Sequence, residues 1–369
     1  MTAPDAPLLE ASGVAKRFGA VVALRDASLT VRPGEVVALM GANGAGKSTF
    51  VKIITGALKP SAGHVRIRGV ERTVGSPAEA RASGLVPVYQ EPSLIPDLDT
   101  AANLRLTGTD RDAFEHWVGE LGIADLDYAE PIAALPLATL RVLDLARALA
   151  AEPDVLLLDE PLSALDLKLR QHMRTELRAI QERVGITFVY ITHDQGEALT
   201  MSDHVAVMSE GRIEQVGDGT TVYDSPDTAF VASFVGENNV IEGTVRESGG
   251  GSALVDTPHG PIRARTSANA ARATLATGDA AMVFVRPESV AVLGPGDETE
   301  NRVRGSVSHR HFEGTLWHVE VAPERGGPDI TLSTLNDGRV GERPVGEAVT
   351  LGFPERLAIA LPRGRLAAE

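Results

Sequence analysis

The order of apolar and polar residues predicts alternating strands and helices through the N-terminal and central parts of the chain. Short apolar runs bounded by turn residues are typical of strands buried in a parallel sheet. Residues 35–40 and 155–158 form two such runs, and residues 50–54 carry apolar side chains at helical spacing. Further strands are expected within 8–32 and at 62–67, 85–90 and 186–192, and helices at 77–82, within 98–150 and at 163–184.

The pattern changes near Val240, where short segments of alternating apolar and polar residues begin. Segments of this kind, separated by turn residues, predict a small barrel of strands. Residues 248–251 are rich in glycine and are expected to form a flexible connection. The strands expected in this part are 240–245, 281–288, one that starts at 305–307, 316–321, 330–332 and 348–353.

Residues 41–49 read G-x-x-x-x-G-K-S-T and lie between an expected strand and an expected helix. This is the context of a P-loop, whose backbone N–H groups face phosphate oxygens. Lys47 is expected to reach the β- and γ-phosphates and Ser48 to hold Mg²⁺, so ATP and Mg²⁺ are the predicted cofactors. A glycine-rich turn without a ligand is the alternative. The nucleotide-binding residues expected here are Gly41, Asn43, Gly44, Gly46, Lys47, Ser48 and Thr49.

The apolar run 155–158 ends in two carboxylates, Asp159 and Glu160. A buried parallel strand delivers such residues to the carboxyl edge of its sheet. Downstream of a P-loop, Asp159 is expected to orient Mg²⁺ and its waters, and Glu160 to polarise the water that attacks the γ-phosphate. A strand that ends in solvated acids is the alternative interpretation.

Three further residues follow or end expected strands. Gln90 and His193 each follow an apolar run, and polar groups at strand ends often face the ligand crevice of an α/β sheet. His193 is expected to contact the γ-phosphate, with a core histidine as the alternative, and Gln90 is either a site residue or an exposed glutamine. Phe18 can stack on an adenine or serve as a half-buried aromatic at a strand end.

Composition narrows the classes of partner. The chain has 369 residues, no cysteine and a formal net charge of −15. Such acidity argues against a nucleic-acid partner, because phosphate attraction requires a basic surface, and the lack of cysteine excludes disulfides and thiolate metal sites. No secretion signal is visible in residues 1–10, and no apolar stretch approaches the ~18 residues that span a membrane. We therefore expect a cytoplasmic protein that reaches a membrane only through a partner.

The pair His309 and His311 alternates along an expected strand and so shares one of its faces. This spacing is compatible with a metal pair. No acid or third histidine with clear spacing joins the pair locally, so a solvated surface is the favoured interpretation.

The ordered motifs resemble those of the nucleotide-binding subunits of ABC transporters over residues 8–237. The resemblance implies a dimer of ATPase subunits that drives two membrane permease subunits, supplied indirectly by an extracytoplasmic solute-binding protein, at the cytoplasmic face of the membrane. By this resemblance Phe18 is the A-loop aromatic, Gln90 the Q-loop residue and a further Mg²⁺ ligand, 155–159 the Walker B strand, Glu160 the catalytic glutamate, 163–166 the D-loop and His193 the switch histidine.

Different parts of the chain resemble different relatives. Residues 35–107 are most similar to monosaccharide importer ATPases, and residues 155–245 to the polyamine, maltose and iron importer group. That group carries a C-terminal TOBE domain, an OB-like module. Residues 285–290 are similar to a sequence motif that is usual in this domain. The predicted fold is therefore an α/β P-loop NTPase domain followed by a small all-β, OB-like barrel. The domain bounds are 1–237, with a helical subdomain at about 91–150, and 238–369.

One family motif is degenerate. Residues 135–139, Leu-Pro-Leu-Ala-Thr, stand where the resemblance implies Leu-Ser-Gly-Gly-Gln, a helix start that contacts the γ-phosphate of the opposite subunit. Pro136 has no N–H or hydroxyl, and Leu137 carries a branched side chain where the backbone should approach phosphate. Proline is welcome near a helix start, so we expect the helix to persist without its anion-binding face.

Three functional hypotheses follow from these observations. The first is an ATPase subunit of a solute importer for a sugar or a polyamine, and the second is one half of an asymmetric, heterodimeric ATPase pair. The third is a non-hydrolysing ATP sensor, against which Glu160 and His193 argue. Soluble ABC proteins of translation or DNA repair usually carry two nucleotide modules or a coiled-coil insertion, neither of which is seen in the sequence.

Overall fold

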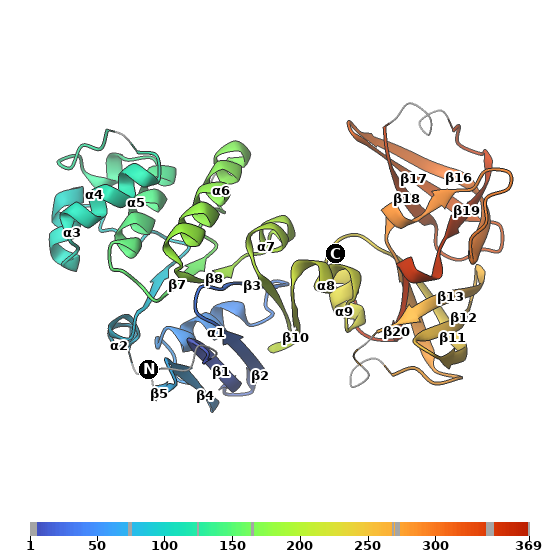
Figure 1. Cartoon of the computed structure of the whole chain (residues 1–369), viewed down its shortest axis with the longest axis horizontal. Coiled ribbons are helices and arrows are strands. Elements are labelled where there is room, and N and C mark those ends of the chain that lie inside the picture. Colours follow the sequence, from blue (N-terminus) through green and yellow to red (C-terminus); the bar gives the residue numbers. More distant parts are fainter. Residues whose placement is uncertain are drawn as a thin grey trace. The chain divides into compact units, whose positions relative to one another are not determined.

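The computed structural model describes residues 6–72, 76–123, 125–163, 166–267, 269, 274–336 and 343–367. The chain forms two compact units, Met1–Gly219 and Thr220–Glu369, each with its own sheets (Figure 1). The predicted combination of an α/β domain and an all-β barrel is confirmed.

The first unit is built on a ten-stranded sheet with the order β5-β4-β1-β2-β10-β9-β3-β8-β7-β6. Strands β9, β3, β8, β7 and β6 run parallel to one another, whereas β1, β2, β4 and β5 pair in antiparallel fashion. The carboxyl ends of the parallel strands therefore lie at one edge of the sheet. The strands are β1 Leu9–Phe18, β2 Val21–Val31, β3 Val36–Gly41, β4 Ala62–Ile67, β5 Val70–Arg72, β6 Leu85–Val88, β7 Val155–Asp159, β8 Thr187–Ile191, β9 His204–Ser209 and β10 Arg212–Gly217.

Several helices of this unit begin at an acidic or hydroxyl cap. Ser76, Asp99, Asp110 and Asp194 each accept a hydrogen bond from a backbone N–H in the first turn. Such caps satisfy donors that the helix itself leaves unpaired. The helices are α1 Lys47–Ile54, α2 Pro77–Ala82, α3 Thr100–Thr107, α4 Arg111–Glu120, the 3₁₀ helix η1 Ile132–Ala134, α5 Leu137–Leu149, α6 Leu167–Val184 and α7 Gln195–Met201.

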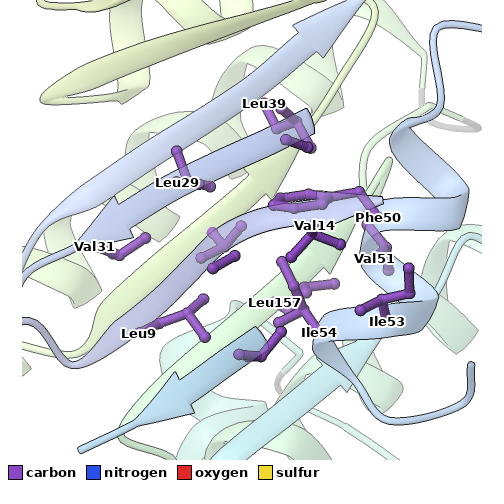
Figure 2. Close-up of a cluster of buried hydrophobic side chains, with 14 of the residues drawn as sticks. Leu9, Val14, Leu29, Val31, Leu39, Phe50, Val51, Ile53, Ile54 and Leu157 are labelled. Atoms are coloured by element: carbon purple, nitrogen blue, oxygen red, sulfur yellow. The ribbon is translucent and has the colours of Figure 1, made fainter. Parts of the chain in front are cut away.

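Helix α1 holds the loop before it in place by packing on the sheet. Phe50 and Ile54 are fully buried, and they belong to the same apolar cluster as Leu9 of β1 and Leu157 of β7 (Figure 2). Burial of one such side chain stabilises a fold by about 1.5–3 kcal/mol. A second cluster joins α4, α5 and α6 to the strands β6, β7 and β8.

The N-terminal strands are longer than the sequence indicates. Residues 8–32 form two strands, β1 and β2, that pair along their length, and their register shifts at three places between Ala11 and Arg17. The sequence pattern indicates shorter strands at 8–11, 21–24 and 27–31, and the irregular register of β1 interrupts the alternation of apolar and polar residues after Ala11.

The second unit contains a closed barrel, β11-β12-β13-β20-β14, and a five-stranded sheet, β15-β19-β16-β17-β18. Its apolar cluster draws on both, because Ile241 and Val283 of the barrel share it with Val321 and Leu351 of the sheet. The elements are α8 Gly219–Asp224, α9 Ala229–Phe234, β11 Asn239–Gly249, β12 Ser252–Thr257, β13 Gly260–Thr266, β14 Ala280–Val285, η2 Pro287–Ser289, β15 Ala291–Val292, β16 Asn301–Glu313, β17 Leu316–Pro323, β18 Ile330–Leu335, β19 Ala348–Phe353, η3 Glu355–Leu357 and β20 Ala358–Pro362.

The expected flexible connection at 248–251 is instead a hairpin. Strand β11 continues to Gly249, which pairs with Ser252 of β12. Gly250 and Gly251 form the two-residue turn with φ of 63° and 81°. Positive φ at both central residues is the requirement of a tight hairpin turn, and glycine meets it without strain.

The two units divide at Gly219, whereas the boundary predicted from the sequence is residue 237. Contacts of the intervening residues with the barrel explain the difference. Arg286, which follows β14, donates hydrogen bonds to the carbonyl oxygens of Tyr223 and Glu237 at 2.8 and 3.0 Å. Within the described residues, no helix is both long enough and apolar enough to cross a membrane.

Candidate functional site

The candidate site lies at the carboxyl edge of the parallel strands of the first unit. The glycine-rich loop follows β3, Gln90 follows β6, Asp159 ends β7 and His193 follows β8. Since these four strands are neighbours in the sheet, the predicted residues converge from separate parts of the sequence.

The loop between β3 and α1 leaves backbone donors available to a ligand. Gly44 and Gly46 have φ of 80° and 109°, which suits glycine, and a Cβ on Gly46 would lie 2.8 Å from the carbonyl oxygen of Ala23. Gly46 caps α1 without a side-chain hydrogen bond, and the first turn of α1 contains no acid. The first N–H groups of α1 therefore have no competing carboxylate, as an anion site requires.

Lys47, the first residue of α1, is buried at 8% exposure. Its Nζ donates hydrogen bonds to the carbonyl oxygens of Gly41 and Ala42 at 2.6 and 3.2 Å. Burial lowers the pKa of this amine, and the carboxylates of Glu160 and Asp159 oppose that shift. The ammonium is thus desolvated and faces two acids, an arrangement that a phosphate could complete.

Asp159 lies at the end of β7, and burial, followed by the charge of Glu160, raises its pKa, while Lys47 opposes the shift. Ser48 follows Lys47 in the first turn of α1. A carboxylate and a hydroxyl are hard oxygen ligands of the type that Mg²⁺ prefers. Their charge and chemistry therefore fit the magnesium site expected from the sequence.

Glu160 has an unusual backbone, with φ of 48°, in the left-handed region. Its N–H donates to the carbonyl oxygen of Ile191 at 3.0 Å, and its own carbonyl oxygen accepts from Arg141 Nη1 and Ser163 Oγ, both at 3.0 Å. A glutamate in this conformation costs about 1–3 kcal/mol and needs such surroundings to hold it. In this conformation Glu160 Oε1 lies 3.0 Å from Nδ1 of His193.

A buried polar network includes Thr192 and Asp194, the residues on either side of His193. Tyr190 and Thr192 donate hydrogen bonds to Glu197 Oε2 at 2.8 and 2.9 Å, and Thr192 Oγ1 accepts one from the N–H of Asp194 at 3.0 Å. Burial raises the pKa of the Tyr190 hydroxyl, so it remains a donor. Fully satisfied buried networks of this kind are rigid.

Helix α5 persists in spite of the degenerate motif, as expected from the sequence. It runs for 13 residues from Leu137 to Leu149, and Pro136 stands at its N-cap position without a side-chain hydrogen bond. Leu137 is 49% exposed, so the helix start presents a branched apolar side chain. The loss of the anion-binding face remains a prediction.

The same helix is bound to two loops of the site. Arg141 Nη1 donates to the carbonyl oxygens of Glu160 and Pro161, each at 3.0 Å. Asp144 is fully buried, pairs with Arg147 at 2.6 Å, and accepts a hydrogen bond from the N–H of Ser93 at 3.1 Å. Helix α5 therefore connects the loop after β6 with the loop after β7.

Gln90 and Phe18 lie at the margin of this arrangement. Gln90 is exposed, two residues beyond the end of β6. Phe18 ends β1 and is 50% exposed, and Lys16 Nζ lies 5.2 Å from its ring centroid. This exposure is compatible both with a half-buried aromatic at a strand end and with a surface on which adenine stacks. Within the expected D-loop, residues 163–166, Ala164 and Leu165 lie outside the described residues.

Sequence reasoning missed Arg141, Asp144 and Glu197. Arg141 and Asp144 are charged residues within an otherwise apolar helix, which is the signal that they have partners, although their spacing does not reveal which ones. Glu197 lies four residues after His193, and only the fold shows that its carboxylate turns inward to Tyr190.

Two family models match the chain. The model described as ABC transporter matches residues 24–163, and the model described as TOBE domain matches residues 283–361. Solved structures match more than half of the chain. The chain is 26% identical to cbiO1 of Clostridium perfringens, part of an ABC transporter complex, with a TM-score of 0.53 over 58% of this chain and 90% of that one. It is 26% identical to a dimeric ATP-binding cassette bound to ADP and phosphate, with a TM-score of 0.52 over 57% of this chain and 98% of that one.

Curated relatives match nearly the whole chain. It is 38% identical over 356 residues to the spermidine/putrescine import ATP-binding protein PotA of Rubrobacter xylanophilus, covering 94% of this chain and 92% of the relative. It is 36% identical over 364 residues to the sulfate/thiosulfate import ATP-binding protein CysA 2 of Chromobacterium violaceum, covering 96% and 95%. The chain therefore belongs to the family of ABC importer ATPases with a C-terminal TOBE domain, the ATP-binding subunits that couple ATP hydrolysis to solute transport.

Proposed function

We propose that this chain binds ATP with Mg²⁺ at the loop 41–49 and hydrolyses it to drive import of a polyamine-class solute. The observation that carries the proposal is the convergence of Lys47, Asp159, Glu160 and His193 at one sheet edge. A buried amine, an uncapped helix start and hard oxygen ligands are the groups that a magnesium triphosphate requires.

Each side chain has a distinct task in this proposal. Lys47 and the N–H groups of residues 44–49 orient the β- and γ-phosphates, and Phe18 stacks on the adenine. Ser48, Asp159 and Gln90 hold Mg²⁺, which when bound neutralises charge on the phosphate oxygens. The buried position of Lys47 strengthens its attraction to phosphate, because few water molecules screen the charge.

Glu160 orients and polarises the attacking water, and His193 contacts the γ-phosphate. The Nδ1 of His193 lies 3.0 Å from Glu160 Oε1, and a carboxylate can only accept a hydrogen bond. With Nδ1 donating to Glu160, the His193 ring would fix the Glu160 carboxylate beside the γ-phosphate.

The transport partners follow from the family. We propose that two ATPase subunits assemble with membrane permease subunits at the cytoplasmic face, and that a solute-binding protein delivers the solute. PotA relatives from several organisms are named for spermidine and putrescine, which supports a polyamine over the sugar considered from the sequence. The sulfate/thiosulfate relative at 36% identity shows that overall similarity does not fix the solute.

The start of α5 favours a more specific arrangement. Pro136 at the start of α5 has neither an N–H nor a hydroxyl to donate to a phosphate, and the exposed Leu137 places a branched apolar side chain beside it. This chain is therefore poorly equipped to contact the nucleotide of a partner. We propose an asymmetric pair in which this chain hydrolyses ATP at its own loop 41–49, closed by a partner with an intact motif. A purified homodimer that hydrolyses ATP at the rate of the assembled transporter would contradict the asymmetric pair, but not the proposed ATPase function.

The proposal is tested by reconstitution with the co-purifying permease in liposomes. ATP-dependent uptake of labelled spermidine is expected, and the Glu160→Gln variant should bind ATP normally but lose hydrolysis by about 10²-fold or more, as expected for loss of a general base. The exposed pair partner Glu115→Gln serves as a matched control on α4. Unchanged hydrolysis in Glu160→Gln would refute the assigned role, and nucleotide binding without any hydrolysis in the assembled complex would favour the sensor.

A further inference from the structure

One face of the sheet in the second unit gathers histidines and carboxylates from β16, β17 and the residue that precedes β18. In the pairing of β16 with β17, His309 lies opposite Glu320 and His311 opposite His318. Glu320 in turn lies opposite Thr331 of β18, and Asp329 comes two residues before Thr331. Since side chains alternate between faces with a period of two, these residues share a face.

Three of these side chains converge on one point. One ligand atom each from His309, Glu320 and Asp329 lies within 4.8 Å of the other two. His309 Nδ1 lies 3.5 Å from Glu320 Oε2. Ligands ~2.1 Å from a tetrahedral zinc ion lie about 3.4 Å from one another, so this pair already has the required separation.

We propose that His309, Glu320 and Asp329 form a binding site for a divalent transition-metal cation, of which Zn²⁺ is the best match. One imidazole and two carboxylates favour zinc over magnesium or calcium, which prefer oxygen ligands alone. The chain has no cysteine, so no thiolate within it competes for such an ion. Two carboxylates also balance the charge of a divalent cation.

The surroundings orient the proposed ligands. Ser308 Oγ donates a hydrogen bond to Asp329 Oδ2 at 2.6 Å, which leaves the second carboxylate oxygen for a metal. Hydrogen bonds of this type to a ligand oxygen help to fix its direction. The sequence alone favours a solvated surface for His309 because no acid or third histidine with clear spacing joins His309 and His311 locally. The strand register supplies two acids from β17 and the segment before β18.

The neighbouring histidines are a separate arrangement and provide a control. Glu313 lies between His311 and His318, at 3.7 and 3.4 Å from their Nε2 atoms. In the part of the chain that the structure describes, His309, Glu320 and Asp329 are the only group of three with all ligand atoms within 4.8 Å. Loss of His311 should therefore leave the proposed site intact.

The site would join β16 and β17 to the segment before β18, so metal binding should stabilise the second unit by mass action. The test is isothermal titration of the full chain with Zn²⁺, without nucleotide and after chelation, together with the shift in melting temperature. One ion per chain is expected at this site. His309→Ala, Glu320→Gln and Asp329→Asn should each weaken it at least tenfold, since loss even of an outer hydrogen-bond partner commonly costs that much.

His311→Ala and the distant, exposed His116→Ala are the matched controls and should bind Zn²⁺ as the unaltered chain does. All three ligand side chains are exposed, so their replacement should not alter melting in the presence of chelator. Zn²⁺ binding that is equal in the His309→Ala variant, or that is lost equally in His311→Ala, would overturn the proposal. So would an unaltered chain that binds no Zn²⁺.

Discussion

Arg141 on helix α5 donates a hydrogen bond at 3.0 Å to the backbone carbonyl oxygen of Glu160. The same Nη1 atom also contacts the carbonyl oxygen of Pro161, and burial lowers the pKa of the guanidinium. Glu160 has the positive φ of 48° at this point. A half-buried cation thus holds the strained peptide that carries the proposed catalytic glutamate, and it comes from the helix that begins at the degenerate motif.

Replacement of Arg141 by methionine should lower kcat for ATP hydrolysis by about tenfold while the KM for ATP changes little. A hydrogen bond from a charged group contributes about 1.5–3 kcal/mol, and 1.4 kcal/mol in the barrier is a factor of ten in rate. KM should hold because the loop 41–49 is not touched. Steady-state kinetics of the assembled transporter measure both constants.

Arg141→Lys should restore part of the rate, because lysine can still donate to one carbonyl oxygen. Arg111→Met on α4, which breaks an exposed ion pair with Glu115, is the matched control and should leave kcat unchanged. If Arg141→Met lowers melting temperature and raises KM in proportion to its effect on kcat, the role is structural rather than one of positioning Glu160.

Asp159→Asn should raise the melting temperature of the nucleotide-free chain at neutral pH while abolishing hydrolysis. Burial and Glu160 raise the pKa of Asp159 above its ordinary value of 3.8, so the folded state disfavours the carboxylate. The unaltered chain therefore loses stability as pH rises from 3.8 through the folded pKa, and it carries the full penalty above both values. A gain of about 1 kcal/mol corresponds to ~2–4 °C in a domain of this size.

The gain from Asp159→Asn should shrink as pH falls toward 3.8, where the carboxyl group is neutral in both states. Differential scanning calorimetry across this pH range measures it. Asp112→Asn, at an exposed position of α4, should show no such gain. A gain that is equally large at low pH would mean that packing, and not charge, is responsible.

The parallel core and the glycine-rich loop are predictable because each rests on local chemistry. An apolar run such as 155–158 has few alternatives to a buried strand, and the loop 41–49 carries its own glycine pattern. Asp159, Glu160 and His193 then follow, since parallel strands place their carboxyl ends at one edge. These predictions need no knowledge of the distant partners of any side chain.

Residues whose role depends on distant pairing are not predictable in this way. Arg141 reaches a carbonyl 19 residues away, and Glu320 meets His309 only through the register of two strands. Strands β9 and β10 of the first unit and β12, β13 and β20 of the second were also not predicted. Gly260 and Pro261 stand at the start of β13, and such residues weaken a strand pattern that the closed barrel nevertheless accommodates.

The start of α5 can be repaired to test the asymmetric pair. Changing residues 136–139 from Pro-Leu-Ala-Thr to Ser-Gly-Gly-Gln restores a hydroxyl cap and lets the backbone of α5 approach a phosphate. The repaired homodimer should hydrolyse ATP at least tenfold faster than the unaltered one, which is equivalent to ~1.4 kcal/mol of barrier. A helix-terminus anion contact commonly contributes that much to the stability of a transition state.

Thr139→Gln alone leaves Pro136 and Leu137 in place and is the matched control, with no expected gain. Steady-state phosphate release from the purified homodimers decides between them. Equal rates in the repaired and unaltered homodimers, with both bound to ATP, would show that the degenerate motif does not limit hydrolysis.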